Sequence, residues 1–316
     1  MRYVLRSDAS LEQGSGHVLR SLAIFQELNS RGHEIVFVGK TANLPWVEEK
    51  IRLTGFKNVL EEENDFSHNS LNDVLVLDSY EIDPRSPFIE KSKWHKIITI
   101  VDHFTPAYSS DLIVRPSILA VTDNVAGSKV LSGLKYFPLR NEIRKTNAYS
   151  DASSFFRVVV VGGGTDFKNF ASAVSHILKK SSFRMSVTLV TDNDAIPGLD
   201  DRFKVIPPGL EVEKTISNAN LAFTTASTSA IEFIAREIPI GIACAVPNQE
   251  DYFQVLPNLG LAIQIGRFKQ DDWDLDENTI LDLLENQSRH SAMREQMKGM
   301  FDLNSTRRIV DEILKL

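Results

Sequence analysis

A glycine-histidine turn near the amino terminus carries the strongest chemical signal in the sequence. Gly14, Ser15, Gly16 and His17 follow the apolar run 3–5 and precede an amphipathic stretch. Two glycines let a turn approach a ligand closely, and the start of a helix leaves backbone amides without intrahelical partners. The positive end of the helix dipole also favours the neutral imidazole, which can accept a proton. We therefore predict that His17 is a general base and that Gly14 and Gly16 border its ligand.

Polar residues follow other apolar runs of the first half in the same way. Asp78 comes directly after the run 74–77, and Asp102 follows the run 97–101. Either aspartate could bind substrate hydroxyls or orient His17, and either could instead cap the next helix. The candidates in this half are Asp8, Tyr80 and Asp102 as catalytic positioning residues and Arg20 as a substrate-binding residue.

A second turn rich in glycine opens the second half of the chain. Residues 162–166 read Gly-Gly-Gly-Thr-Asp and follow the apolar run 157–161 directly. Three consecutive glycines differ from the spaced fingerprint of dinucleotide-binding folds. A strand-to-helix turn of this kind can still bind a diphosphate through backbone amides and the helix dipole. The candidate contacts are Gly163, Gly164, Thr165 and Asn169.

A third polar cluster, residues 224–232, again lies between a strand-like run and a helix-like stretch. The hydroxyls of Thr228 and Ser229 could donate to phosphate oxygens, and Glu232 could accept hydrogen bonds from both ribose hydroxyls. The same pattern fits an ordinary helix N-cap followed by an acidic residue, and both interpretations stay open. Asn248 and Gln249 add polar groups after a further apolar run.

These turns need a scaffold that brings strand ends together. Short apolar runs alternate with stretches of helical period, which is typical of βα units and parallel sheets. The expected strands are 3–5, 35–38, 74–77, 97–101 and 112–114, then 157–161, 186–190, 204–206, 221–224, 238–243 and 261–265. We predict an α/β fold of two doubly wound, Rossmann-like domains, 1–147 and 148–316, joined by the polar segment 141–154. Ligands of such sheets bind at the carboxyl ends of the strands, so we expect the substrate in a central cleft between the domains.

Composition excludes several classes of partner. Acidic residues outnumber basic ones by 42 to 35, a formal charge of −7 that disfavours binding to nucleic acid. The single cysteine, Cys244, fits a reducing compartment, and we expect neither a secretory leader nor a membrane-spanning stretch. The histidines lack the paired spacing of a zinc site. We expect a cytoplasmic monomer that needs no metal ion or cofactor and does not insert into a membrane.

Together, these motifs resemble the sugar-nucleotide hydrolases of the pseudaminic-acid pathway. The similarity extends over about the first 260 residues and rests on the segments 6–20, 78–80, 139–142, 163–169 and 232–249. It implies the GT-B fold and hydrolysis of UDP-2,4-diacetamido-2,4,6-trideoxy-β-L-altropyranose to the free sugar and UDP. It also implies that His17 is the base and that the second domain binds UDP through the segments 163–169 and 229–232. Where the family has two successive aspartates, this chain has Asp102 and His103, on the side of the sugar.

The expected reaction is attack of water on the anomeric carbon, with inversion, while the glycine-rich turn stabilises the departing diphosphate. Two alternatives remain. A glycosyltransferase on the same scaffold would replace water by an acceptor hydroxyl. A protein that binds a nucleotide sugar without catalysis would keep the turns and lose the base, and the intact Gly16-His17 pair argues against it.

Overall fold

The computed structural model describes residues 1–11, 14–41, 44–69, 71–79, 82–102, 108–119, 125–145, 156–166, 168–193, 196–209, 212–216 and 218–316. These residues form two compact units. Unit 1 comprises Met1–Arg144 together with Phe301–Leu316, and unit 2 comprises Lys145–Met300. Each unit is built around its own sheet.

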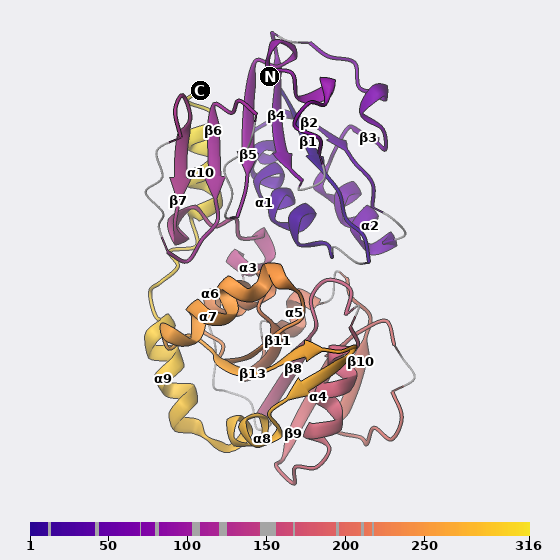
Figure 1. Ribbon diagram of the computed structural model, residues 1–316, viewed down its shortest axis with the longest axis vertical. Helices are drawn as coiled ribbons and strands as arrows, with labels where there is room; N and C mark the ends of the chain where they lie inside the picture. Colours follow the sequence, from indigo (N-terminus) through magenta and orange to yellow (C-terminus); the bar gives the residue numbers. More distant parts are fainter. Residues whose placement is uncertain are drawn as a thin grey trace. The chain divides into compact units, whose positions relative to one another are not determined.

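The sheet of unit 1 has seven strands in the order β3-β2-β1-β4-β5-β6-β7 (Figure 1). Every pairing along this order is parallel. The strands are β1 (Arg2–Ser7), β2 (Glu34–Val38), β3 (Asn58–Leu60), β4 (Asp73–Asp78), β5 (Lys96–Ile100), β6 (Leu112–Arg115) and β7 (Lys129–Ser132). The order reverses at β1, which has β2 on one side and β4 on the other. In open α/β sheets, ligands bind at the carboxyl ends of the strands beside such a reversal.

Alternate residues of β1 enter two separate apolar clusters. Tyr3 and Leu5 pack with the buried residues of α1 (Gly16–Ser30), whereas Val4 packs in the cluster that contains Phe88 and Trp94. Successive side chains of a strand point to opposite faces of its sheet, so the sheet of unit 1 is covered on both faces. The other helices among residues 1–145 are α2 (Pro45–Thr54), α3 (Asn141–Lys145), and the 3-10 helices η1 (Glu63–Asp65), η2 (Pro87–Ile89), η3 (Lys91–Lys93) and η4 (Leu134–Tyr136).

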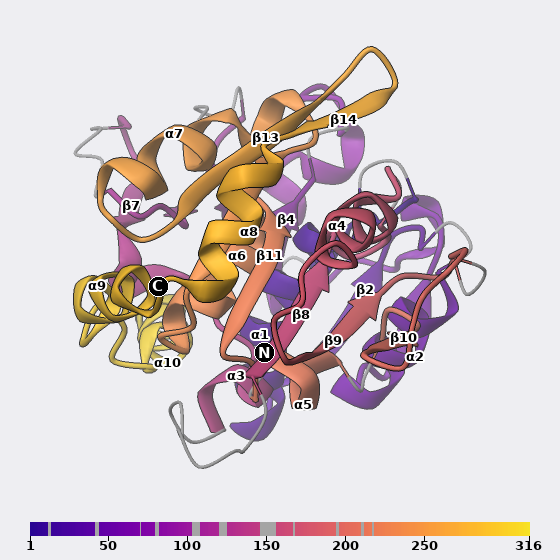
Figure 2. The same ribbon diagram turned by 90° about the horizontal axis from the view of Figure 1, so that it is seen from below.

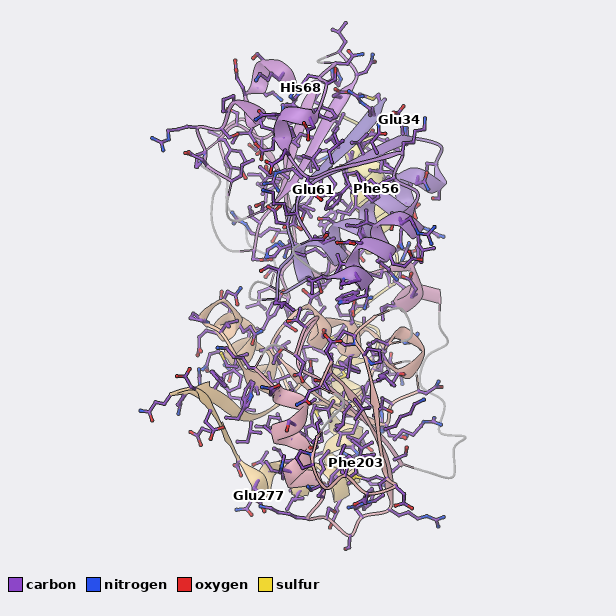
Figure 3. All side chains as sticks on the ribbon, turned by 90° about the vertical axis from the view of Figure 1, so that its right-hand side faces the viewer. Glu34, Phe56, Glu61, His68, Phe203 and Glu277 are labelled. Atoms are coloured by element: carbon purple, nitrogen blue, oxygen red, sulfur yellow. The ribbon has the colours of Figure 1, made fainter. Side chains whose placement is uncertain are left out.

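Helix α1 is the amphipathic stretch expected after the glycine-histidine turn. Val18, Leu22 and Phe25 are buried, and Gly32 adopts a φ of 82° just beyond the end of the helix. Such a left-handed glycine is a common helix stop. Phe56, labelled in Figure 3, stacks on Phe25 with ring centroids 5.3 Å apart. This contact fixes α1 against the segment that follows α2.

The carboxyl-terminal helix α10 (Ser305–Ile313) belongs to unit 1, whereas the sequence placed it in the second domain. Figure 1 shows this yellow helix among the purple elements of unit 1. Its buried face packs in the same cluster as α1, and the Thr306 hydroxyl donates to the Leu139 carbonyl at 2.8 Å. Arg31 at the end of α1 also donates to Asp311 at 2.6 Å. The physical reason is that an amphipathic helix packs where its apolar face is covered, whatever its place along the chain.

Unit 2 contains a second seven-stranded sheet, in the order β10-β9-β8-β11-β12-β13-β14. Its pairings are parallel except that of β13 with β14, which is antiparallel. The strands are β8 (Phe156–Val161), β9 (Met185–Val190), β10 (Phe203–Ile206), β11 (Leu221–Thr225), β12 (Ile240–Cys244), β13 (Ile263–Lys269) and β14 (Asp272–Leu275). The helices are α4 (Phe170–Leu178), α5 (Val212–Ile216), α6 (Thr228–Ala235), α7 (Glu250–Asn258), α8 (Glu277–Glu285), α9 (Gln287–Met297) and the 3-10 helix η5 (Pro247–Gln249).

The predicted α/β class with two doubly wound sheets is confirmed. Every strand expected from an apolar run is present, with bounds that differ by a few residues. The strands that the sequence missed are β3, β7 and β14, which lie at sheet edges and keep exposed residues. Of the predicted linker, Asn141–Lys145 forms α3, and 146–154 lies outside the described residues. Within the described part of the chain, no helix is both long and apolar enough to cross a membrane.

Candidate functional site

His17 and Asp78 form the centre of the candidate site in unit 1. His17 is the second residue of α1, and its Nδ1 atom lies 2.7 Å from Oδ1 of Asp78. Asp78 is the last residue of β4, which pairs with β1 so that Ser7 and Asp78 are opposite each other. The turn that leaves β1 leads into α1, and the reversal of strand order therefore brings these two side chains together.

Three groups besides His17 fix the position of the Asp78 carboxylate. Arg20 donates from Nε to Oδ2 at 2.8 Å and from Nη2 to Oδ1 at 2.7 Å, and the Ser21 hydroxyl donates to Oδ2 at 2.7 Å. Burial by itself raises the pKa of Asp78, but the charge of Arg20 and the hydrogen bonds from Arg20 and His17 outweigh it and hold the pKa well below its usual range. Asp78 is therefore an ionised carboxylate within the protein.

The tautomer of His17 follows from this arrangement. Nδ1 of His17 also lies 3.1 Å from Nη2 of Arg20, so on distance alone it could accept from Arg20 or donate to Asp78. An unprotonated Nδ1 would direct its lone pair at a carboxylate 2.7 Å away, which is repulsive. The contact with Asp78 therefore favours the tautomer with its proton on Nδ1, in which Nε2 carries the lone pair that can accept a proton from a reacting group.

Asp102 balances the charge of Arg20. Nη1 of Arg20 donates to Oδ1 of Asp102, and 27% of the Asp102 side chain is exposed, compared with 6% for Arg20. Arg20 thus donates to two carboxylates, Asp78 and Asp102, beside the ring of His17.

The other predicted residues of unit 1 have separate places. Asp8 accepts from Nη1 of Arg6 at 2.5 Å and from the Lys40 amide at 2.9 Å. Its contacts connect the end of β1 to neighbouring segments and do not include His17. Gly14 and Gly16 are half-buried, at the turn into α1, and Gly14 has a φ of 77°. Tyr80 and His103 lie outside the described residues.

The structure brings together His17, Arg20 and Asp102 of the predicted set, with Asp78 at their centre. The sequence left the role of Asp78 open and did not select it as a site residue. Its position at the end of an apolar run was a signal, although the sequence does not state which strand lies beside β1. Arg20, predicted to bind substrate, directs its guanidinium at the two aspartates.

The glycine-rich turn of unit 2 is built around Asp166. Oδ1 of Asp166 accepts from the Ala171 amide in the first turn of α4 at 3.2 Å. A Cβ at Gly162 would lie 1.9 Å from the same oxygen, so a larger residue there would have to displace the Asp166 carboxyl group. Burial raises the pKa of Asp166 to about 6, although hydrogen bonds from Thr191 and from backbone amides of α4 oppose the shift. Gly163, Gly164 and Thr165 are half-buried, and Asn169 is exposed.

The hydroxyl-rich cluster lies beside this turn because β8 pairs with β11. Val161 is opposite Thr224, and the Thr225 hydroxyl lies 3.5 Å from the Gly162 carbonyl oxygen and 3.3 Å from the Ser227 hydroxyl. Thr228 and Ser229 open α6 and are half-buried, whereas Glu232 is 5% exposed. Two of the three predicted polar clusters of this half therefore meet at the carboxyl ends of two neighbouring strands, β8 and β11.

Asn248 and Gln249 lie in η5, beyond β12. Oε1 of Gln249 accepts from the Ala245 amide at 2.9 Å, which closes the loop, and Asn248 is exposed. Among the residues that the structure describes, no group of three or more histidines, cysteines, aspartates or glutamates could hold a metal ion.

Comparison with known sequences identifies one curated relative. No protein-family model matches the chain. An uncharacterized protein of Methanocaldococcus jannaschii, MJ1062, is 28% identical over 208 residues, which are 60% of this chain and 42% of that protein. The chain thus spans less than half the length of the curated relative that it matches.

Solved structures similar to this chain align with nearly its whole length. Acinetobacter baumannii MurG matches with a TM-score of 0.63 and 13% identity, over 100% of both chains. Arabidopsis thaliana UGT89C1 complexed with UDP-L-rhamnose matches with a TM-score of 0.67 and 13% identity, over 99% of this chain and 98% of that one. Similarity at this level of identity shows the fold, and the chain accordingly has the two-domain α/β fold of the GT-B glycosyltransferases.

Proposed function

We propose that the protein is a nucleotide-sugar hydrolase in which His17 is the general base. The observation that carries the proposal is the 2.7 Å contact between Nδ1 of His17 and the buried carboxylate of Asp78. This contact favours the tautomer with the proton on Nδ1, in which Nε2 would accept the proton of the attacking water. A base that is oriented by a buried carboxylate is a recurring arrangement in enzymes that activate a hydroxyl group or a water molecule.

The proposed reaction is a single displacement. A water molecule transfers a proton to Nε2 of His17 while its oxygen forms a bond to the anomeric carbon of the sugar. The bond from that carbon to the diphosphate oxygen breaks, and UDP leaves with the electron pair. Asp78 stabilises the imidazolium, and the sugar is released with inverted configuration.

Unit 2 supplies the nucleotide-binding groups in this proposal. Backbone amides of the turn containing Gly163 and Gly164, together with the hydroxyls of Thr165, Thr228 and Ser229, would bind the diphosphate, and Glu232 would accept from the ribose hydroxyls. The turn and the hydroxyl cluster lie side by side on β8 and β11, as binding to one compact ligand requires.

The proposed substrate is UDP-2,4-diacetamido-2,4,6-trideoxy-β-L-altropyranose or a close relative. Support comes from the sequence resemblance described above, which includes His17 and the glycine-rich turn. The chain departs from the family at Asp102 and His103. The second aspartate of the family is His103 in this chain, on the side of the sugar, and a related sugar is the expected consequence.

A glycosyltransferase is the second candidate. The similar solved structures include plant UGT89C1 in complex with UDP-L-rhamnose, and the same fold would serve either reaction. A histidine base can deprotonate an acceptor hydroxyl as readily as water, so only the identity of the acceptor separates the two activities.

One experiment separates these candidates. The purified chain is incubated with a panel of UDP-sugars without an acceptor, in water enriched in oxygen-18, and the release of UDP is followed. Hydrolysis at the anomeric carbon predicts release of UDP, with the label in the free sugar and none in UDP. Label in UDP would place the attack on phosphorus. UDP release that requires a hydroxylated acceptor would identify a transferase.

A further inference from the structure

The edge hairpin of unit 2 is bent by two local features. The register of β13 on β12 shifts between Ile242 and Ala243, which is the mark of a β-bulge. Gly266 has a φ of 143°, and a Cβ there would lie 2.1 Å from the Asp274 carbonyl oxygen. Only glycine therefore lets the two strands of the hairpin approach so closely. Figure 2 shows this hairpin, whose strand β14 contacts α4.

Trp273 of β14 contacts Lys168, which lies between the glycine-rich turn 162–166 and α4. Its Nε1 atom donates to the Lys168 carbonyl at 2.8 Å, and its ring lies 4.9 Å from the Phe170 ring at the start of α4. In the order of the sheet, β11, β12 and β13 separate β14 from β8, the strand that leads into this turn. The bent hairpin thus connects the far edge of the sheet to the turn.

The hairpin holds the side chain of Lys168 as well as its carbonyl group. Nζ of Lys168 lies 4.4 Å from the centroid of the Phe268 ring, a cation-π distance, and Phe268 packs against Trp273 with centroids 5.3 Å apart. Lys168, which follows the glycine-rich turn 162–166, is therefore held at its carbonyl group and at its ammonium group by two aromatic residues of one hairpin.

The backbone of the turn needs such support. Asp166 and Asn169, on either side of Lys168, have φ values of 47° and 53°. Aspartate and asparagine enter this left-handed region more readily than other residues with a side chain, and contacts from the surrounding structure help to keep them there. Asp166 supplies one restraint from within the turn, through the Ala171 amide. The hairpin supplies a further restraint from outside, at Lys168.

We propose that Trp273 is a positioning residue that sets the conformation of the glycine-rich turn and, through it, the affinity of the turn for the diphosphate of a nucleotide. This inference rests on the proposed function, in which the turn binds that diphosphate. Trp273 acts through the Lys168 carbonyl and needs no contact with the ligand. A substitution of Trp273 would therefore act on the amides that are proposed to bind phosphate. It should weaken binding of the diphosphate and leave binding of the nucleoside unchanged.

The test is Trp273→Phe in the full chain, which keeps an aromatic ring and removes the N–H donor. We expect faster hydrogen exchange of the amides in Gly162–Asp166 without any ligand. We also expect UDP to bind about threefold to tenfold more weakly, the usual worth of one hydrogen bond, while uridine binds as in the parent protein. The readouts are exchange followed by mass spectrometry and calorimetric titration with UDP and with uridine.

Trp94→Phe is the matched control. Nε1 of Trp94 donates to the Phe88 carbonyl at 2.6 Å, and its ring stacks on Phe66, but all three residues lie in unit 1. The variant loses the same kind of hydrogen bond, but in unit 1. Hydrogen exchange in the turn of unit 2 and the affinity for UDP should therefore match those of the parent protein.

The outcomes distinguish the inference from the proposed function. Unchanged exchange in the turn of the Trp273 variant would overturn the inference. Equal weakening of UDP and uridine would also overturn it, because it would show a general loosening of unit 2. If exchange accelerates but the parent protein does not bind UDP, the hold of Trp273 on the turn is supported, and the proposed function is the part that fails.

Discussion

Nδ1 of His17 and Oδ1 of Asp78 lie 2.7 Å apart, although 61 positions separate the two residues in the sequence. Arg20 and Ser21 hold the same carboxylate, so its position is set independently of the histidine. A carboxylate fixed in this way determines both the orientation of the imidazole and the site of its proton. The first two predictions test this pair.

Replacing the base should affect chemistry far more than binding. His17→Asn should lower turnover of a UDP-sugar by about a hundredfold or more, because a positioned general base contributes roughly that factor. UDP affinity should stay nearly unchanged, since the proposed nucleotide contacts lie in unit 2. Steady-state UDP release and calorimetry measure the two quantities. Turnover close to that of the parent protein would remove His17 from the mechanism.

Replacing Asp78, the partner of His17, should change the tautomer of the imidazole. The amide of Asp78→Asn can donate to Nδ1 of His17, which would move the imidazole proton to Nε2 and abolish the base. We expect kcat to fall by roughly a hundredfold to ten-thousandfold, as in other enzymes whose histidine loses its orienting carboxylate. The measurement is kcat for UDP release, corrected for the folded fraction.

Asp73 provides the control for this variant. It begins the strand that Asp78 ends, is equally buried, and accepts from Nε of Arg2 at 2.8 Å. Asp73→Asn should lower the thermal midpoint and leave kcat of the folded protein unchanged. Equal losses of kcat in the two variants would mean that Asp78 is structural.

A variant of Glu232 tests the proposed binding of the nucleotide by unit 2. Glu232→Ala should weaken UDP binding by on the order of 1.5–3 kcal/mol, the usual value of a hydrogen bond to a charged group. Glu277→Ala is the control, because the side chain of this residue, labelled in Figure 3, is 42% exposed and pairs with Lys180 in unit 2. Calorimetric titration with UDP provides the comparison. Affinity unchanged in both variants would favour the interpretation of Glu232 as part of a helix cap.

Asp166 predicts a particular dependence of stability on pH. Its pKa rises from an ordinary value of 3.8 to about 6 on folding, chiefly because the carboxyl is buried. The folded state therefore binds the proton more tightly, and stability falls as the pH rises from about 3.8 to about 6 and stays lower above it. Asp166→Asn removes this penalty, and asparagine tolerates the left-handed backbone.

We expect Asp166→Asn to raise the free energy of unfolding by on the order of 1–3 kcal/mol near neutral pH. The difference between variant and parent protein should shrink as the pH falls below about 4, where the aspartate is protonated in both states. Denaturant titrations across this range measure it. A difference that is constant with pH would show that the carboxyl of Asp166 does not titrate as expected.

Much of the fold could be predicted because local patterns encode it. The apolar runs at the buried strands and the i, i+4, i+7 spacing of Val18, Leu22 and Phe25 specify strands and a helix with few alternatives. The short, partly exposed edge strands β3, β7 and β14 lack that signal, because strand propensity without burial is weak.

The sequence by itself determined which residues stand at the ends of strands: His17 after β1, Asp78 and Asp102 near the ends of β4 and β5, and the glycine-rich turn after β8. Only the tertiary structure decided that β4 lies beside β1, so that Asp78 meets His17, and that Trp273 reaches Lys168 from the far edge of a sheet. The physical reason is that local spacing depends on residues a few positions apart. Strand order and hairpin bending instead depend on apolar packing and backbone hydrogen bonds summed over a whole unit.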